Sequence, residues 1–453
     1  MKLQHTLLAG VIAGAMTSLM GATAHAAITA EQAKALGTTL TGVGAEKAAN
    51  KDGSIPAYDG GLTKPPAGFK AGDGVRPNPY ANEKPKFSID AKNMAQYAGN
   101  LSEGSKALLQ QYPTMRIDVY PTHRSVAFPK FVTDNTAKTA LTANTSNGGR
   151  SIEGAHAGFP FPIPKDGYEA MWNHLVRFNG QAYESKYRNL TVDSSGRATL
   201  ATEGNSVQEY PYWDPSKSSA ETYWRMKLSY TAPARRAGEA LLLVDPLDIG
   251  TKDRRAWSYL PGQRRVKVAP DFSFDTPNPG TAGGNTFDDV FIFNGSMDRY
   301  DFKLVGKKDI FVPYNAYAAV YGAKQDELLK PNHLNPDLVR WELHRVWVVE
   351  ATLREGKRHV YSKRTFYLDE DSWAALASDE YDARGQIYRA GFAYMAPSYD
   401  LPAPYTDMFT TYDLIARSYS LTGFIAETGG VKHTKPLADR EWTADALAGS
   451  GVR

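Results

Sequence analysis

The stretch that decides the fold is GFPFPIPKDGYEAMWNHLVRFNG, residues 158–180. Its first half alternates apolar residues with proline: Phe159, Pro160, Phe161, Pro162, Ile163 and Pro164. Each proline fixes φ and removes a backbone donor, so this run is predicted to be stiff and extended, and it cannot lie centrally in a sheet. The apolar side chains between the prolines must therefore be held by packing.

The second half of this stretch predicts a short amphipathic helix. Asp166 is a suitable N-cap, and Glu169 three residues later completes a capping-box pattern. Gly180 is expected to end the helix. Apolar side chains recur at helical spacing along one stripe: Tyr168, Met171, Trp172, Leu175 and Val176. Two interpretations stay open, a core helix with a rigid lead-in or a helix that covers the mouth of an apolar cavity.

The N-terminus has the pattern of a secretory signal peptide. Lys2 supplies positive charge, residues 7–20 are apolar, and Ala24-His25-Ala26 fits a cleavage site, so residues 1–26 are predicted to be removed. No later stretch approaches the ~20 apolar residues that span a bilayer. We expect the mature protein to be soluble, or at most peripheral at a membrane.

Charge and cysteine content exclude several classes of protein. The full chain carries a net charge of only +3, which argues against a nucleic-acid partner. Three pairs of basic residues are interpreted as solvated strand ends or turns, with binding to anionic lipid headgroups as a minor alternative: Arg235-Arg236, Arg254-Arg255 and Arg264-Arg265. There is no cysteine, so neither a disulfide nor a lipidated cysteine is available.

Residues 27–119 are predicted to form an N-terminal arm with short helices. Helices are expected at 29–36, capped by Thr29 and Gln32, and at 102–112, capped by Ser102. Between them, residues 38–85 are rich in glycine and proline, which indicates either an irregular arm wrapped over the surface or a mobile leader.

Residues 120–453 are predicted to form a mainly β domain. Strands are expected at 224–230, where apolar and polar residues alternate, and at 239–245. Three hairpins are indicated, at 256–268, 345–368 and 373–395. Successive hairpins favour an antiparallel meander that curls into a half-barrel. Short strand-like runs are also expected at 125–128 and 131–132.

The motifs of known catalytic sites are missing from the sequence. It contains no nucleophile elbow, phosphate-binding loop, dinucleotide fingerprint or H-E-x-x-H zinc motif, so we expect no catalytic residues, no cofactor and no metal. The histidines after residue 26 are dispersed, and none are paired at i, i+4: His123, His156, His174, His333, His344, His359 and His433. Four acids are interpreted as solvated turn residues, with calcium as the less favoured alternative: Asp288, Asp289, Asp298 and Asp301.

Three segments carry a resemblance to a known family. Residues 158–180, 254–270 and 359–389 resemble the secreted Gram-negative family catalogued as domain of unknown function 1329. The last two segments are also similar to strands of the wider LolA/LolB-like lipoprotein-carrier superfamily. The resemblance implies an α+β fold, in which a strongly curved, incomplete antiparallel barrel is covered by helices and takes up acyl chains.

The resemblance also implies a function. We expect a periplasmic carrier or chaperone for a lipid-like ligand, with an inner-membrane exporter of the resistance-nodulation-division type and an outer-membrane protein as partners. Two alternatives stay open, a non-catalytic scaffold that bridges envelope components and a hydrolase acting on an envelope lipid through dispersed acids, histidines and tyrosines. Sequence does not decide between a filled and a hollow interior. The residues predicted to line an apolar cavity are Phe159, Phe161, Trp172, Leu175, Phe178, Trp224, Met226 and Trp257.

Overall fold

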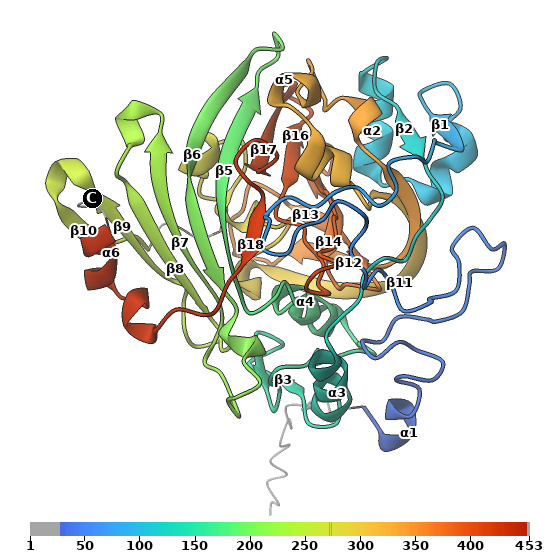
Figure 1. Cartoon of the computed structure of the whole chain (residues 1–453), viewed down its shortest axis with the longest axis horizontal. Helices are drawn as coiled ribbons and strands as arrows, with labels where there is room; N and C mark the ends of the chain where they lie inside the picture. Colours follow the sequence, from blue (N-terminus) through green and yellow to red (C-terminus); the bar gives the residue numbers. More distant parts are fainter. Residues whose placement is uncertain (1–27, 271, 273, 451–453) are drawn as a thin grey trace, which may run out of the picture.

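The computed structural model describes residues 28–270, 272 and 274–450 (Figure 1). The predicted signal peptide, residues 1–26, lies outside the described residues. In the part of the chain that is described, no helix has the length and apolar character needed to cross a lipid bilayer.

One large, open sheet organises the molecule. Along most of the sheet the strand order is β1-β2-β12-β13-β14-β15-β16-β17-β5-β6-β7-β8-β9-β10, and β11 and β18 pair with β12 and β5. The strand pairs are antiparallel, apart from a parallel contact between β2 and β12. In Figure 1 the green strands β5–β8 face the orange strands β12–β14 across an interior, with α4 at its lower end. The predicted class, a curved antiparallel sheet with helices, is confirmed.

The strands have the following bounds: β1 Phe87–Ile89, β2 Ile117–Val119, β3 Asn144–Ser146, β4 Ser151–Glu153, β5 Ala182–Val192, β6 Ala198–Glu209, β7 Thr222–Ala232, β8 Ala240–Pro246, β9 Arg255–Leu260, β10 Arg265–Val268, β11 Tyr300–Pro313, β12 Trp341–Leu353, β13 Lys363–Asp369, β14 Ala375–Tyr381, β15 Ile387–Ala393, β16 Phe409–Asp413, β17 Ser418–Phe424 and β18 Val431–His433. The α-helices are α1 Ala30–Ala33, α2 Glu103–Gln111, α3 Lys130–Thr139, α4 Gly167–Leu175, α5 Gln325–Leu328 and α6 Ala444–Ser450.

The predicted strands and hairpins are present. Strands β7 and β8 occupy the two predicted strand segments, and β9–β10, β12–β13 and β14–β15 form the three predicted hairpins. In the first hairpin the turn ends on Arg264, with φ +47°. The strand after the second turn begins at Lys363, five residues later than predicted. The predicted strand-like runs at 125–128 and 131–132 were wrong. Residues 125–128 are irregular, and residues 131–132 lie in α3, which starts directly after Pro129.

Helix α4 begins where the sequence indicates but ends earlier. The side chain of Asp166 accepts a hydrogen bond from the amide of Glu169 at 2.9 Å. The predicted stop at Gly180 was wrong, since the helix ends at Leu175. Other groups take over its last carbonyls, because Trp213 Nε1 donates to Val176 O at 2.7 Å and Arg177 Nη1 donates to His174 O at 3.2 Å.

Helix α4 is also buried nearly all round rather than on one stripe. Its polar side chains Glu169, Asn173 and His174 are at most 2% exposed. His174 links three parts of the fold, since Nε2 bonds Phe293 O at 2.8 Å and Nδ1 accepts from the amide of Ala375 on β14 at 3.0 Å. Burial lowers the pKa of His174 to about 3, so the ring stays neutral. The geometry supports the core-helix interpretation.

The N-terminal segment packs against the domain that follows it. Helices α1 and α2 are capped by Thr29 and Ser102 as predicted. Between them the chain is largely irregular, yet Val43, Ala45 and Ile55 are buried. Trp373 Nε1 also donates to Val43 O at 2.9 Å. Of the two interpretations, the wrapped arm is therefore the one observed, and β1 and β2 extend the main sheet.

Candidate functional site

A groove with a volume of about 90 Å³ lies between the inner face of β5–β8 and the segment 278–294, which we name the cover. The cover connects β10 to β11 and contains no β-strand. At roughly 10–15 Å³ for each water-sized group, the groove has room for a short molecular segment. A longer molecule would have to extend beyond it or displace the cover.

Strand register places the side chains of the groove. Successive residues of a strand point to opposite faces, so alternate residues of each strand share the inner face. Gln208 on β6 pairs with Met226 on β7, which pairs with Leu243 on β8. One step along, Ser206 pairs with Leu228, and Leu228 with Leu241. The groove floor is therefore built from rows of neighbouring side chains.

A chain of polar contacts lies at one end of the groove. Trp224 Nε1 donates to Gln208 Oε1 at 3.0 Å, and Gln208 Nε2 donates to Asp407 Oδ2 at 2.9 Å. The hydroxyl of Tyr183 donates to the same carboxyl oxygen. Burial raises the pKa of Asp407, partly offset by the hydrogen bond from Tyr183 and by the charge of Arg177. The hydrolase alternative requires a carboxyl group with a partner within hydrogen-bond reach, and Asp407 meets this condition. Tyr183 and Gln208 only donate hydrogen bonds to Asp407, however, and these contacts do not form a nucleophile–base pair.

The cover is held down by buried ion pairs. Arg364 on β13 contacts Asp288 at 3.3 Å and Asp289 at 2.9 Å. His359 Nε2 lies 3.0 Å from Asp288 Oδ2, and Tyr361 donates to Asp289 at 2.8 Å. The prediction that these two aspartates are solvated turn acids was wrong, because both are at most 4% exposed. Their partners come from distant strands, and their spacing in the sequence gave no sign of them.

The other two acids of that group remain nearer the surface. Asp298 pairs with Arg150 at 2.7 Å and with Lys357 at 2.6 Å, and its side chain is 28% exposed. Asp301 is 72% exposed and pairs with Arg354. These two match the prediction of solvated acids more closely than the buried pair does.

The structure separates the predicted cavity residues into groups. Trp224 and Met226 line the groove. Phe178 borders a different pocket of about 400 Å³ near Arg76. Trp257 is half-buried and packs against a second, smaller apolar cluster. The remaining four are core residues at most 4% exposed: Phe159, Phe161, Trp172 and Leu175. Ligand contact by any of the eight stays a prediction.

Sequence reasoning missed the other groove walls. Strands β5 and β6 contribute polar side chains, and the cover contributes Phe287, Val290 and Phe291. A signal was present on β5, because Tyr183, Ser185 and Tyr187 alternate with charged residues. Asp407 and Phe409 had no comparable signal, since they reach the groove only because β16 pairs with β17 and β17 pairs with β5.

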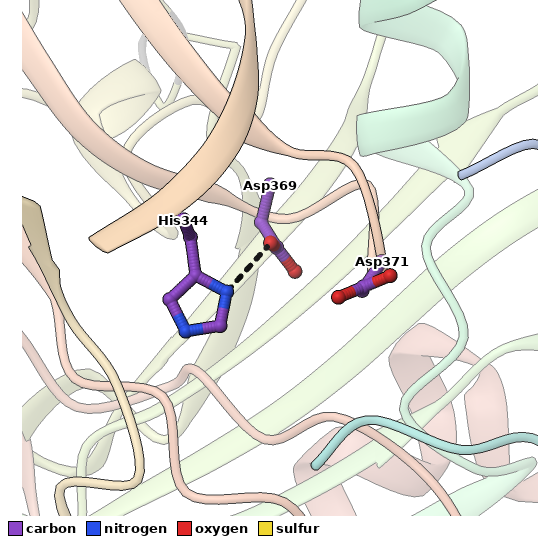
Figure 2. A group of neighbouring side chains, drawn as sticks. All are labelled: His344, Asp369 and Asp371. Atoms are coloured by element: carbon purple, nitrogen blue, oxygen red, sulfur yellow. Dashed lines mark ion pairs between the residues drawn. The ribbon is translucent and has the colours of Figure 1, made fainter. Parts of the chain in front are cut away.

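A second group of ionisable side chains comes from β12, the end of β13 and the turn before β14. Figure 2 shows His344, Asp369 and Asp371 directed toward one another, with ligand atoms within 4.8 Å. Asp369 Oδ1 lies 3.9 Å from His344 Nδ1, and His344 Nε2 lies 3.1 Å from Glu342. Burial, reinforced by the neighbouring Asp371, raises the pKa of Asp369 to about 7.

Residue types alone would allow this group to hold a metal ion, but its contacts fit an ion-pair cluster better. Both oxygens of Asp371 accept from Arg124, at 2.9 Å and 2.6 Å. A metal ion bound there would sit beside a guanidinium that cannot lose its charge. The bidentate ion pair already neutralises the carboxylate that a metal would need.

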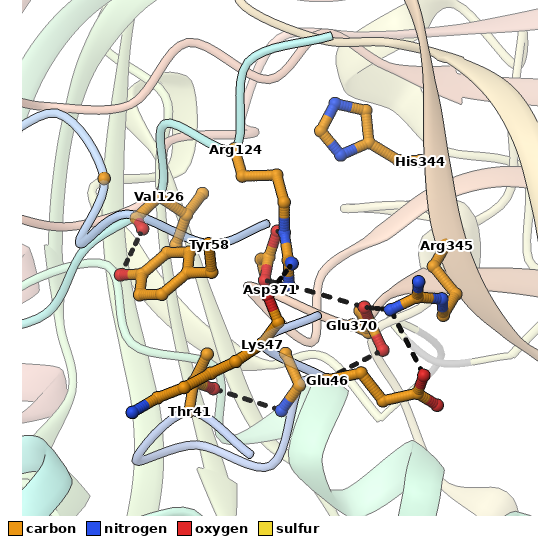
Figure 3. Close-up of polar contacts among 12 residues, drawn as sticks. Thr41, Glu46, Lys47, Tyr58, Arg124, Val126, His344, Arg345, Glu370 and Asp371 are labelled. Atoms are coloured by element: carbon orange, nitrogen blue, oxygen red, sulfur yellow. Dashed lines mark hydrogen bonds and ion pairs between the residues drawn. The ribbon is translucent and has the colours of Figure 1, made fainter. Parts of the chain in front are cut away.

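These ion pairs fasten the N-terminal arm to the sheet (Figure 3). Glu370 pairs with Arg345 at 2.7 Å and with Lys307 at 3.0 Å, and Lys307 also contacts Glu46 of the arm at 2.8 Å. On the other side of the cluster, Tyr58 donates to the carbonyl of Val126 at 3.0 Å. The cluster therefore joins the arm, β11, β12 and the turn before β14, and we interpret it as structural.

The chain is similar to several known proteins. The chain is 40% identical to the uncharacterized protein PA3922 of Pseudomonas aeruginosa over 445 residues, which cover 96% of this chain and 97% of that protein. A solved DUF1329 family protein from Desulfovibrio piger is 15% identical, with a TM-score of 0.42, over 61% of this chain and 95% of the other.

Two further solved structures have names that refer to the LolA superfamily and to lipoprotein sorting. One is the LolA superfamily protein NE2245 from Nitrosomonas europaea, 13% identical with a TM-score of 0.38, over 62% of this chain and all of that one. The other is a Vibrio parahaemolyticus domain named for outer membrane lipoprotein sorting, 13% identical with a TM-score of 0.43, over 62% and 97%. The family model for "Protein of unknown function (DUF1329)" matches residues 88–448, so the chain belongs to the DUF1329 family.

Proposed function

We propose that this protein is a periplasmic carrier or chaperone for a lipid or other hydrophobic ligand that moves between the inner and outer membranes. The observation that carries the proposal is the groove between β5–β8 and the cover. One wall of it is built from apolar side chains: Trp224, Met226, Leu228, Leu241 and Leu243. Burying hydrocarbon there is favourable by roughly 0.8 kcal/mol per methylene.

The cover offers a way for such a ligand to enter and leave. Phe291 and Ile292 have φ of +56° and +71°, a region that bulky side chains seldom occupy. Backbone strain of this kind recurs at ligand clamps and switch regions. The cover therefore has a strained backbone at Phe291 and Ile292, and ion pairs with Arg364 on β13 hold it in place. An inner-membrane exporter of the resistance-nodulation-division type and an outer-membrane protein are the partners we propose from the family resemblance.

A groove-filling variant tests the proposal. Leu228 is half-buried and lines the groove, so Leu228→Trp should occupy its space. Val207→Trp is the matched control, since Val207 lies on the adjacent strand, pairs with Lys227 and packs in the second apolar cluster. Protein purified from periplasm is analysed by native mass spectrometry and lipid extraction.

We expect apolar compounds to co-purify with the unmodified protein and with Val207→Trp, but not with Leu228→Trp. Titration with the uncharged dye N-phenyl-1-naphthylamine should give the same ranking. If none of the three proteins retains a compound or binds the dye, the carrier function is wrong and the scaffold alternative gains support. Turnover of an extracted lipid during incubation would instead favour the hydrolase.

A further inference from the structure

The two walls of the groove differ in polarity. The β7–β8 wall is mainly apolar, as described above. The wall formed by β5 and β6 is polar throughout: Ser185, Tyr187, Asn189, Ser206 and Gln208. A groove that received only a hydrocarbon chain would gain nothing from such a wall, because burying polar groups without partners is costly.

Three buried polar atoms along this wall have no hydrogen-bond partner in the described chain. They are Tyr187 Oη, Ser206 Oγ and Asp407 Oδ1. The three side chains are 6%, 4% and 7% exposed, and all three line the groove. Buried polar groups in proteins are nearly always paired, so three orphans in one groove indicate partners supplied from outside the chain.

The register of β6 gives the spacing of these atoms. Tyr187 pairs with Gly204, and a Cβ at Gly204 would lie 3.2 Å from the tyrosine hydroxyl. Ser206 follows two residues later, and Gln208, which holds Asp407, two residues after that. At about 3.3 Å per residue, the polar groups extend over roughly 13 Å along the strand.

The cation that lines the groove is neutralised within the chain. Arg254 donates to both oxygens of Asp245, at 2.6 Å and 2.7 Å. Burial raises the pKa of Asp407 and of Tyr187, which disfavours a negative charge on either group, and the tyrosine hydroxyl can donate. The guanidinium of Arg177 lies 4.5 Å from the centre of the Phe291 ring and does not line the groove.

We infer that the groove binds an uncharged, elongated amphiphile whose hydroxyl or carbonyl groups lie along one side, facing Tyr187, Ser206 and Asp407. This inference rests on the proposed function, because it names the chemistry of the ligand carried in the same groove. The apolar side of the molecule packs on β7 and β8, and its polar side completes the hydrogen bonds of β5 and β6. A plain acyl chain satisfies only the first wall.

The experiment uses a double variant, Tyr187→Phe with Ser206→Ala. Neither hydroxyl has a partner within the described protein, so the variant should melt at the same temperature as the unmodified protein or higher. Ser146→Ala is the matched control, because Ser146 Oγ is also buried and unpartnered but belongs to β3, outside the groove. The probes are N-phenyl-1-naphthylamine by direct titration, and 1-dodecanol and dodecanoate by competition.

We expect the Kd for 1-dodecanol to rise about five- to tenfold in the double variant and to stay unchanged in Ser146→Ala, in keeping with the loss of one hydrogen bond. Dye affinity should be equal in all three proteins. An unchanged Kd for 1-dodecanol alongside normal dye binding overturns this inference and leaves the carrier function intact. Tighter binding of dodecanoate than of 1-dodecanol overturns it too, since the ligand would then be anionic. Failure of the unmodified protein to bind the dye or the alcohol instead refutes the proposed function.

Discussion

Arg364 Nη2 on β13 donates a hydrogen bond to the backbone carbonyl of Ile292, at 3.1 Å. The same nitrogen contacts Asp289 at 2.9 Å, so one guanidinium holds both the backbone and a carboxylate of the cover. Because Ile292 has a positive φ, this contact secures a turn that its β-branched side chain disfavours. Arg364 is therefore one of the anchors that hold the cover over the groove, together with His359 and Tyr361.

Replacing that cation should loosen the cover. Arg364→Met leaves Asp288 and Asp289 without their cation, and breaking a buried ion pair typically costs about 3–5 kcal/mol. We expect this loss in chemical denaturation, with faster amide hydrogen exchange across residues 286–294. Arg384→Met in an exposed turn is the control. Unchanged exchange in the cover would show that other contacts hold it.

Trp172→Ala distinguishes the core helix from a cavity wall. Trp172 is fully buried and does not line the groove, so its removal should cost about 3–5 kcal/mol. Met226→Ala should cost less, because Met226 borders existing space, but it should weaken binding of N-phenyl-1-naphthylamine more. Urea denaturation and dye titration measure the two effects. A small stability loss with a large binding loss for Trp172→Ala would contradict the core assignment of α4.

The sequence predicted those parts of the fold in which local pattern and tertiary environment agree. Alternation at Trp224, Met226 and Leu228 marked a strand with one buried face, and that face does line the groove. Asp166 marked the start of α4 through its cap. The end of α4 was missed because side chains from elsewhere, Trp213 among them, take the last carbonyls in place of a glycine cap.

The site was harder to predict because its parts meet only in the folded chain. In the sequence the cover is a glycine-rich loop that contains acidic residues. Its position in the fold depends on contacts with Arg364, which lies more than seventy residues away in the chain. Hydrophobicity marks residues 159, 161 and 172 as buried, but it does not distinguish a core from a lined groove. It gives no weight to the polar residues of β5 and β6, although they form one wall.

The N-terminal arm should detach when its anchor is weakened. Arg124 Nη1 donates to the carbonyls of Lys47 and Pro56 in the arm, each at 3.5 Å. The guanidinium is held in place by both oxygens of Asp371, a geometry that lysine cannot reproduce. Arg124→Lys should therefore make residues 41–58 more susceptible to limited proteolysis, and we expect cleavage there before the main sheet unfolds. Lys130→Arg, on the exposed side of α3, is the control. Equal cleavage rates in both variants would mean that apolar contacts such as Val43 hold the arm.

Asp369 should make stability fall as pH rises. Its pKa is about 7 in the folded protein, against an ordinary value of 3.8. Between these values the unfolded chain has lost a proton that the folded protein keeps, so the contribution of Asp369 to stability declines from about pH 4 to pH 7.

Asp369→Asn imitates the neutral form and can still accept from Ser372. Relative to the unmodified protein, the variant should be near-neutral at pH 4 and progressively more stable toward pH 8, by up to about 1.4 kcal/mol for each pKa unit. Urea denaturation from pH 4 to 8 measures this, with the exposed Asp326→Asn as a control that should show no trend. A constant difference for Asp369→Asn would mean that the carboxyl is ionised in the fold, stabilised by Arg124 and His344 despite its burial.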